Sequence, residues 1–85
     1  MVIDLHNSIN EIIGLVDNNH LEQAKIKAIK VNPKNDILYN VLGIIYLKLN
    51  EHSEAINSFK KAIELNNEFL SAIINLAICF QEIKE

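Results

Sequence analysis

The chain has 85 residues, enough for one domain, and its hydrophobic content of 49% excludes an intrinsically disordered protein. With only two Gly and one Pro, it lacks the turn residues of a small all-β fold, so helices joined by short turns are favoured. The net charge is −3 and all eight basic residues are Lys, which argues against a nucleic-acid-binding protein with an Arg-rich basic surface.

The first predicted helix covers residues 3–16. Its inward-facing side chains are Leu5, Ile9, Ile12, Ile13 and Val16. In the turn that follows, Asn18 or Asn19 is expected to cap the second helix, which covers residues 20–31. The apolar face of this second helix consists of Leu21, Ala24, Ala28 and Val31. Pro33 separates it from the next helix, because proline disfavours the helical conformation in the residue before it.

The third predicted helix, residues 36–49, carries apolar side chains on opposite faces, which is typical of a helix buried on more than one side. It ends at Asn50, a residue type that tolerates the left-handed conformation found at helix ends. The fourth helix covers residues 52–65. Its apolar face is Ala55, Ile56, Phe59, Ala62 and Ile63, and its solvated face is Lys60, Lys61 and Glu64. A fifth helix begins near residue 69 and runs to the end.

An internal repeat appears when the sequence is shifted by 34 residues. The row Tyr39, Leu42, Gly43, Tyr46 then falls on Ile73, Leu76, Ala77, Phe80, and Lys27, Ala28, Ile29 fall on Lys61, Ala62, Ile63. The middle unit resembles the tetratricopeptide repeat family at Tyr39, Leu42, Gly43, Tyr46, Ala55, Phe59 and Ala62, with Asn67 where the family usually has Pro. Small residues in this pattern let two helices approach closely while the aromatic rings fill the wedge between them.

The resemblance implies an all-α fold in which antiparallel helix pairs stack into a short right-handed superhelix of about five helices. We expect a single domain over residues 1–85, with a degenerate first repeat at about 1–34, a second at about 35–68 and half a repeat at 69–85. The first helix can be aligned in two ways. Either Leu5, Ile9 and Ile12 take the inward places without a gap, or Ile9, Ile12, Ile13 and Val16 take them with one turn deleted; we favour the second.

No residue pattern indicates catalysis. His6, His20 and His52 lack the spacing of metal ligands on one helix face. Cys79 lies in an apolar run and is expected to be an inert, buried thiol. We therefore predict a protein that is not an enzyme and that needs no cofactor or metal.

The expected location is the cytoplasm. A lone cysteine cannot form an internal disulfide and so permits a reducing compartment. The N-terminal residues do not resemble a signal peptide, and no apolar run is long enough to span a membrane. The location stays a prediction on these grounds.

The resemblance implies a concave groove, lined by the first helix of each pair, that holds a peptide. The corresponding positions are Ile37, Asn40, Ile44, Leu47 and Lys48 in the second repeat, and Ser71, Ile74, Asn75, Ile78 and Gln81 in the third. Ile44 and Ile78 could equally pack on each other as core residues. Asn40 and Asn75 could hydrogen-bond a peptide backbone. We expect the partner to be a protein or peptide and not a nucleic acid.

An apolar or amphipathic peptide suits these isoleucines better than an acidic one. Family members that grip acidic chaperone tails use a cationic clamp, and no position that corresponds to it here carries a positive charge. The corresponding residues are Asn10, Gly14, Val41, Ser71 and Asn75.

The last helix suggests an alternative function, because it is apolar around nearly its whole circumference. Either the natural chain continues past Glu85 or a second copy covers this helix. The self-association face would consist of Ile73, Leu76, Phe80 and Ile83. A further alternative is that the chain is the regulatory N-terminal part of a longer enzyme.

Overall fold

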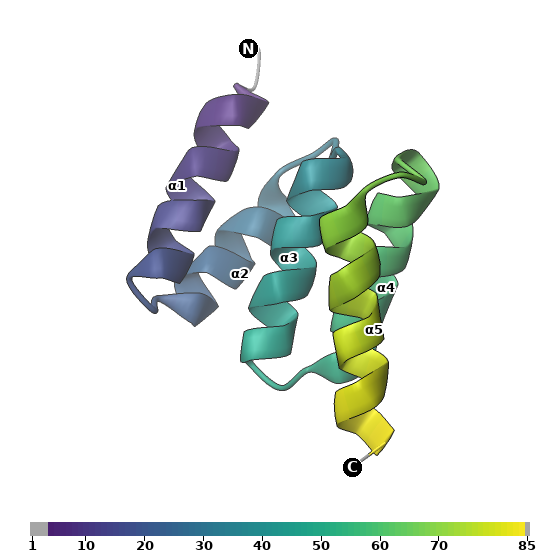
Figure 1. Ribbon diagram of the computed structural model, residues 1–85. Coiled ribbons are helices and arrows are strands. Elements are labelled where there is room, and N and C mark those ends of the chain that lie inside the picture. Colours follow the sequence, from purple (N-terminus) through teal and green to yellow (C-terminus); the bar gives the residue numbers. More distant parts are fainter. Residues whose placement is uncertain (1–3, 85) are drawn as a thin grey trace.

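The computed structural model describes residues 4–84, which form five helices and no strand. The helices are α1 (Leu5–Asp17), α2 (Leu21–Lys30), α3 (Asp36–Lys48), α4 (His52–Leu65) and α5 (Leu70–Lys84). Consecutive helices run in opposite directions; α1, α3 and α5 lie side by side in one layer, and α2 and α4 lie behind them (Figure 1). The predicted all-α fold is therefore confirmed. The predicted helix start at Ile3 lies outside the described residues.

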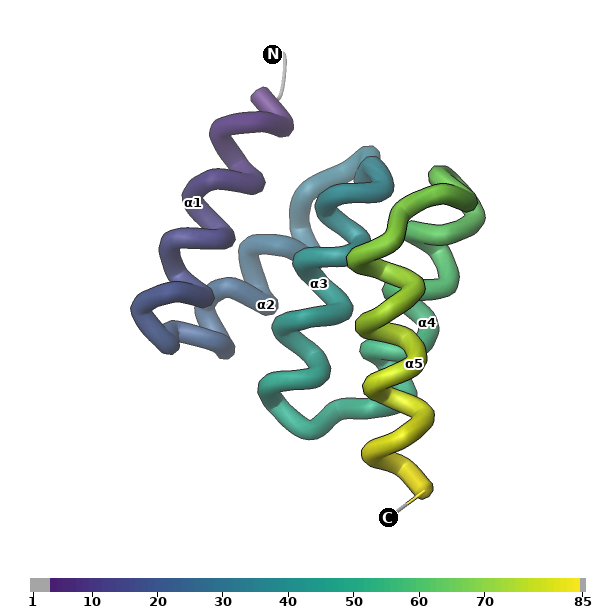
Figure 2. Tube along the Cα trace, viewed as in Figure 1, coloured from purple at the N-terminus to yellow at the C-terminus, as the bar shows by residue number. Residues whose placement is uncertain are grey.

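The helix α3 is the centre of the molecule, since it packs against all four other helices (Figure 2). Its most extensive interface is with α4. Its buried residues are Leu38, Asn40, Val41, Leu42, Gly43 and Ile45. The prediction that this helix is buried on more than one side is thereby confirmed.

Side chains cap the first helix of each of the two helix pairs, α1 and α3. The Asp4 carboxylate accepts a hydrogen bond from the Asn7 backbone N–H at 3.1 Å, and the Asn35 side-chain oxygen accepts one from the Leu38 N–H at 2.8 Å. Such bonds satisfy backbone N–H groups that have no partner in the first turn of a helix. The starts of α1 and α3 are thus set by local sequence.

The turns between paired helices depend on asparagine in the left-handed region. Asn19 has φ 63° and Asn50 has φ 61°. The prediction for Asn50 is confirmed, whereas the prediction that Asn18 or Asn19 caps α2 is wrong. Asn18 instead ends α1, where its side chain donates to the Gly14 carbonyl at 3.0 Å, and His20 stands at the start of α2 without a side-chain capping bond.

The first helix pair matches the second with a shift of 31 residues, so that Leu5 corresponds to Asp36 and Leu21 to His52. Equivalent turn hydrogen bonds support this shift, because the His20 N–H donates to the Leu15 carbonyl and the Glu51 N–H to the Tyr46 carbonyl. The shorter α2, with 10 residues against 14 in α4, accounts for the missing turn.

The favoured alignment of the first helix is therefore wrong by one residue, although it correctly expected a deleted turn. That alignment turns Ile13 inward, but Ile13 is 38% exposed. The fully buried residue is its neighbour Ile12. A displacement of one residue rotates a helix position by about 100°, which is enough to move a side chain from the core to the surface.

At Gly43, the backbone of α3 lies in close contact with the Phe59 ring of α4. A Cβ atom at this position would lie under 3.0 Å from three ring carbons of Phe59. The Phe59 side chain is fully buried, so its ring cannot avoid the added atom by turning into solvent without leaving the core. In the first pair, the corresponding residues are Ile12 and Ala28, both fully buried. The large and small residues are thus exchanged between the two helices of that pair.

We expect Gly43→Ala to destabilise the protein by about 1–3 kcal/mol, because the added methyl group overpacks the interface with Phe59. Gly14→Ala is the matched control, since Gly14 also lies inside a helix but a Cβ there meets nothing within 4 Å. This control should gain about 0.5–1 kcal/mol from helix propensity alone. Urea unfolding followed by circular dichroism measures both values, and equal stabilities of the two variants would contradict the packing argument.

Candidate functional site

The predicted groove positions lie on α3 and α5, in the layer that also contains α1 (Figure 1). Three of their isoleucines are exposed: Ile37 at 47%, Ile74 at 49% and Ile78 at 37%. Ser71, Lys48 and Gln81 are exposed as well, while Ile44, Leu47 and Asn75 are half-buried. The layer therefore presents several isoleucines to solvent in addition to the side chains that it buries.

Asn40 and Asn75 bond to each other. The Asn75 side-chain NH₂ donates to the Asn40 side-chain oxygen at 3.3 Å, which links α3 to α5. Asn40 is only 8% exposed, so its side chain mainly belongs to the interface between these helices. The sequence predicts that both side chains could bond to a peptide, and it gives no local sign of this contact because the two residues are 35 positions apart.

A hollow of about 310 Å³ lies between α1 and α3 in the same layer. It is lined by Ile13, Val16, Asp17, Val41, Ile44 and Lys48. Ile44 also packs against the buried cluster of α4 and α5, so this residue has a core role, and its contact with a peptide stays a prediction. The contribution of α1 was not predicted, since the alignment placed Ile13 in the core.

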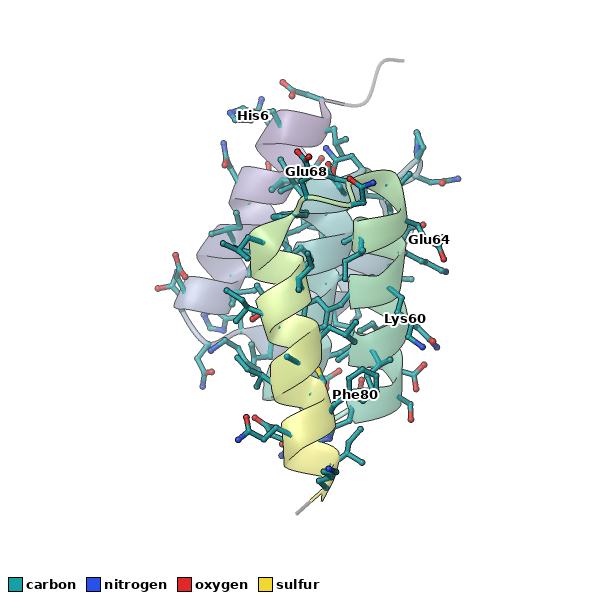
Figure 3. The ribbon with its side chains drawn as sticks, turned by 45° about the vertical axis from the view of Figure 1, so that its right-hand side comes forward. His6, Lys60, Glu64, Glu68 and Phe80 are labelled. Atoms are coloured by element: carbon teal, nitrogen blue, oxygen red, sulfur yellow. The ribbon has the colours of Figure 1, made fainter. Side chains whose placement is uncertain are left out.

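The predicted self-association residues on α5 fall into two groups. Leu76 packs against the buried cluster of Ala55, Phe59 and Cys79. In contrast, Ile73, Phe80 and Ile83 are exposed, and Figure 3 labels Phe80 on α5. Two further residues, Leu70 and Ile74, are exposed on the same helix. The expectation that α5 cannot bury all its apolar residues against α4 and α3 is thus confirmed.

Cys79 is a buried thiol, as predicted, and has no exposed surface. Burial, assisted by the nearby Glu82 carboxylate, raises the pKa of the Cys79 thiol. A thiol with a raised pKa is a poor nucleophile, because the reactive thiolate is scarce. Cys79 therefore serves packing between α5 and α4.

The three histidines lie apart from one another. The His6 ring is 3.3 Å from the Asn10 side-chain nitrogen, His20 stands before α2, and His52 is 2.9 Å from the Glu82 carboxylate. Over residues 4–84, no three His, Cys, Asp or Glu side chains are grouped so that they could hold a metal ion. None of the helices in this range is long and apolar enough to cross a membrane.

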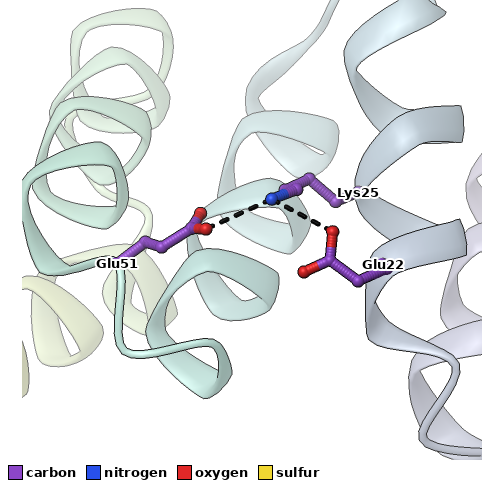
Figure 4. Close-up of polar contacts among 3 residues, drawn as sticks. All are labelled: Glu22, Lys25 and Glu51. Atoms are coloured by element: carbon purple, nitrogen blue, oxygen red, sulfur yellow. Dashed lines mark hydrogen bonds and ion pairs between the residues drawn. The ribbon is translucent and has the colours of Figure 1, made fainter.

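An ion pair joins the first helix pair to the second (Figure 4). The Lys25 ammonium on α2 lies 3.2 Å from the Glu51 carboxylate, just before α4, and 3.2 Å from Glu22 one turn earlier on α2. The hydrogen bonds to Glu51 and then to Glu22 raise the pKa of Lys25 above its ordinary value of 10.5. The contact braces the two pairs on the side of α2 and α4.

The sequence is similar to known proteins that contain tetratricopeptide repeats. A family model described as tetratricopeptide repeat matches residues 37–69. The peroxisomal targeting signal receptor of Candida glabrata is 34% identical over 64 residues, which are 68% of this chain and 11% of that receptor. Human protein O-mannosyl-transferase TMTC3 is 36% identical over 62 residues, 72% of this chain and 7% of the transferase. The uncharacterised protein ycf37 of Pyropia yezoensis is 38% identical over 48 residues, 56% of this chain and 27% of that protein.

The chain thus spans only a small part of each of these curated relatives. The similarity covers the complete repeat, in which α3 and α4 form their close interface. It agrees with the motif that the sequence contains at Tyr39, Gly43 and Phe59.

We expect Glu51→Gln to lower the pKa of Lys25 toward its ordinary value, because the variant removes the charged partner that raises it most. NMR titration of the lysine side chains measures this shift. The folded pKa lies above the unfolded one, so the pair stabilises the fold fully below about pH 10.5 and loses its effect as the pH rises through the folded value. Glu54→Gln is the control, as Glu54 forms no ion pair with Lys25. An unchanged Lys25 titration in Glu51→Gln would contradict the assignment.

Proposed function

Because residues 37–69 are a tetratricopeptide repeat, which is a protein–protein interaction module, we propose that this chain holds a peptide segment of a partner protein against the layer of α1, α3 and α5. The observation that carries the proposal is the set of exposed isoleucines Ile37, Ile74 and Ile78 in the layer that also contains the hollow between α1 and α3. Several apolar side chains exposed on one layer are typical of surfaces that bind other proteins.

The chemistry of this layer supports an apolar or amphipathic segment. Burying one isoleucine contributes roughly 1.5–3 kcal/mol, so two or three such contacts supply most of a moderate affinity. Asp17 and Lys48 line the hollow at the ends of α1 and α3 and offer one charge of each sign to the polar side of the segment. A strongly acidic peptide would meet Asp17 and only one cation here.

The similarity to the Candida glabrata protein supports peptide recognition, because its name describes a receptor for a targeting signal. This chain matches 11% of that receptor, so the identity of the signal does not carry over. The cytoplasmic location also stays a proposal, which rests on the single, buried and unpaired Cys79.

We expect peptides selected for binding to the wild-type chain from a displayed library to bind Ile74→Asp at least about tenfold more weakly, since an apolar contact is replaced by a charge that must lose water. Isothermal titration calorimetry with the selected synthetic peptides measures the change. Ile26→Asp is the matched control, because Ile26 on α2 is exposed to a similar degree, 52%, but lies in the other layer. Equal losses in the two variants, at unchanged helicity, would exclude this layer as the binding surface.

A second candidate function is self-association through α5. It is supported by Leu70, Ile73, Phe80 and Ile83, all exposed on this one helix. An apolar helix face of this kind is covered in water by a partner or a second copy. The third candidate, a regulatory part of a longer enzyme, is supported only by the similarity to 7% of the human O-mannosyl-transferase.

We expect a concentration-dependent dimer in sedimentation-velocity experiments if α5 is the interface, and a monomer after Phe80→Asp, because the charge cannot be buried without a partner. Leu65→Asp, at an exposed leucine near the end of α4, serves as the control and should dimerise like the wild type. A wild-type chain that stays monomeric at high concentration would exclude self-association.

A further inference from the structure

The helix α3 lines a second hollow on the side opposite to the hollow that it forms with α1. This hollow measures about 280 Å³ and lies between α2 and α4. From α3, it is lined by Tyr39, Leu42 and Tyr46. These residues lie on the face of α3 opposite to Val41, Ile44 and Lys48, which line the first hollow. It is near the lower limit of pockets that hold small ligands, so it suits a small molecule or one side chain.

Two lysines form one end of this second hollow. The Lys34 ammonium donates to the carbonyls of Ile29 and Val31, at 2.9 and 2.7 Å, and these bonds hold it beside the end of α2. The Lys61 ammonium lies 5.6 Å from the centre of the Tyr39 ring. Because an ammonium has three N–H donors, Lys34 keeps one donor for a ligand after its two carbonyl bonds.

The two lysines are not neutralised by the protein. Within residues 4–84, neither ammonium forms an ion pair with a carboxylate, although both line the same hollow. Burial and the positive charge of Lys61 lower the pKa of Lys34. An anion between the two ammonium groups would remove this repulsion, as an opposite charge favours the protonated lysine.

The other end of the hollow has a different character. Tyr46 lies two helical turns from Tyr39, which is about 10 Å along α3. The Glu54 carboxylate lines this end, where burial and then the charge of Glu54 raise the pKa of Tyr46. The buried Ser58 lies between the lysine and glutamate ends of the wall. The hollow is therefore polarised, with its positive end at Tyr39.

We propose that this second hollow binds a small ligand that carries a carboxylate or phosphate group, with the oxyanion at Lys34 and Lys61 and the rest of the ligand over Leu42. Lysine ammonium groups bind such oxyanions as point charges. The site is separate from the hollow between α1 and α3, since the two hollows are lined by different residues of α3. Ligand binding here is independent of whether the layer of α1, α3 and α5 binds a peptide.

The chain carries its own reporter for this site. It has two tyrosines and no tryptophan, and both tyrosines line the hollow, so all intrinsic fluorescence above the phenylalanine range comes from the site. We expect a saturable change of tyrosine fluorescence when the protein is titrated with phosphate or acetate at an ionic strength held constant with sodium chloride. A response to phosphate alone assigns a phosphate ligand, and a response to acetate alone assigns a carboxylate.

Lys61→Gln should weaken the apparent affinity by about tenfold, the effect of losing one charge-assisted contact. Lys60→Gln is the matched control, as Lys60 precedes Lys61 on α4 but projects from the outer side of this helix, as does Glu64 (Figure 3). It should bind like the wild type. Circular dichroism checks that both variants remain helical.

Amide shifts in NMR spectra give a second measurement that does not depend on a variant. Phosphate or acetate should shift the amide signals of Ser58 and Lys61 and leave that of Ile74, on α5, unchanged. The proposal is overturned if neither anion gives a saturable response, if sodium chloride alone gives the same response, or if Lys61→Gln binds like Lys60→Gln.

Discussion

The close approach of α3 to α4 at Gly43 is the constraint on which the rest of the structure depends. The missing side chain lets the Phe59 ring lie against the backbone of α3. The same ring then contributes to the buried cluster that includes Cys79 and that Leu76 packs against, which docks α5. The contact between Gly43 and Phe59 therefore determines the spacing of α3 and α4 and also contributes to the position of α5. Because interiors are densely packed, such a position tolerates little change in volume.

The first helix pair fills an equivalent interface in the opposite way. Ile12 on α1 corresponds to Gly43, and Ala28 on α2 corresponds to Phe59, so the large side chain comes from the other helix. This exchange conserves a filled core while it removes the aromatic pattern of the repeat. It explains why the first unit packs as a helix pair although its sequence departs from the family motif. The Lys25–Glu51 ion pair then adds a polar link between the two pairs.

The helix α3 separates two surfaces of different chemistry. One side contributes Ile44 to an apolar layer with α1 and α5, and the other contributes Tyr39 and Tyr46 to a polarised hollow with α2 and α4. A helix that is apolar on opposite faces therefore supplies both the core and the walls of two candidate sites. The exposed apolar residues of α5 form a third surface.

The sequence alone was sufficient to predict the helices, the turn at Asn50 and the Gly43–Phe59 interface. Each of these depends on a signal within a few residues or one repeat, namely the apolar spacing, the tolerance of asparagine for the left-handed conformation, and the repeat motif. The alignment of α1, the bond between Asn40 and Asn75, and the hollow beside Lys61 could not be predicted. Each depends on residues from different helices that meet only after packing. Helical periodicity states which side chains share a face, but the neighbouring helix determines whether that face is core, contact or open surface.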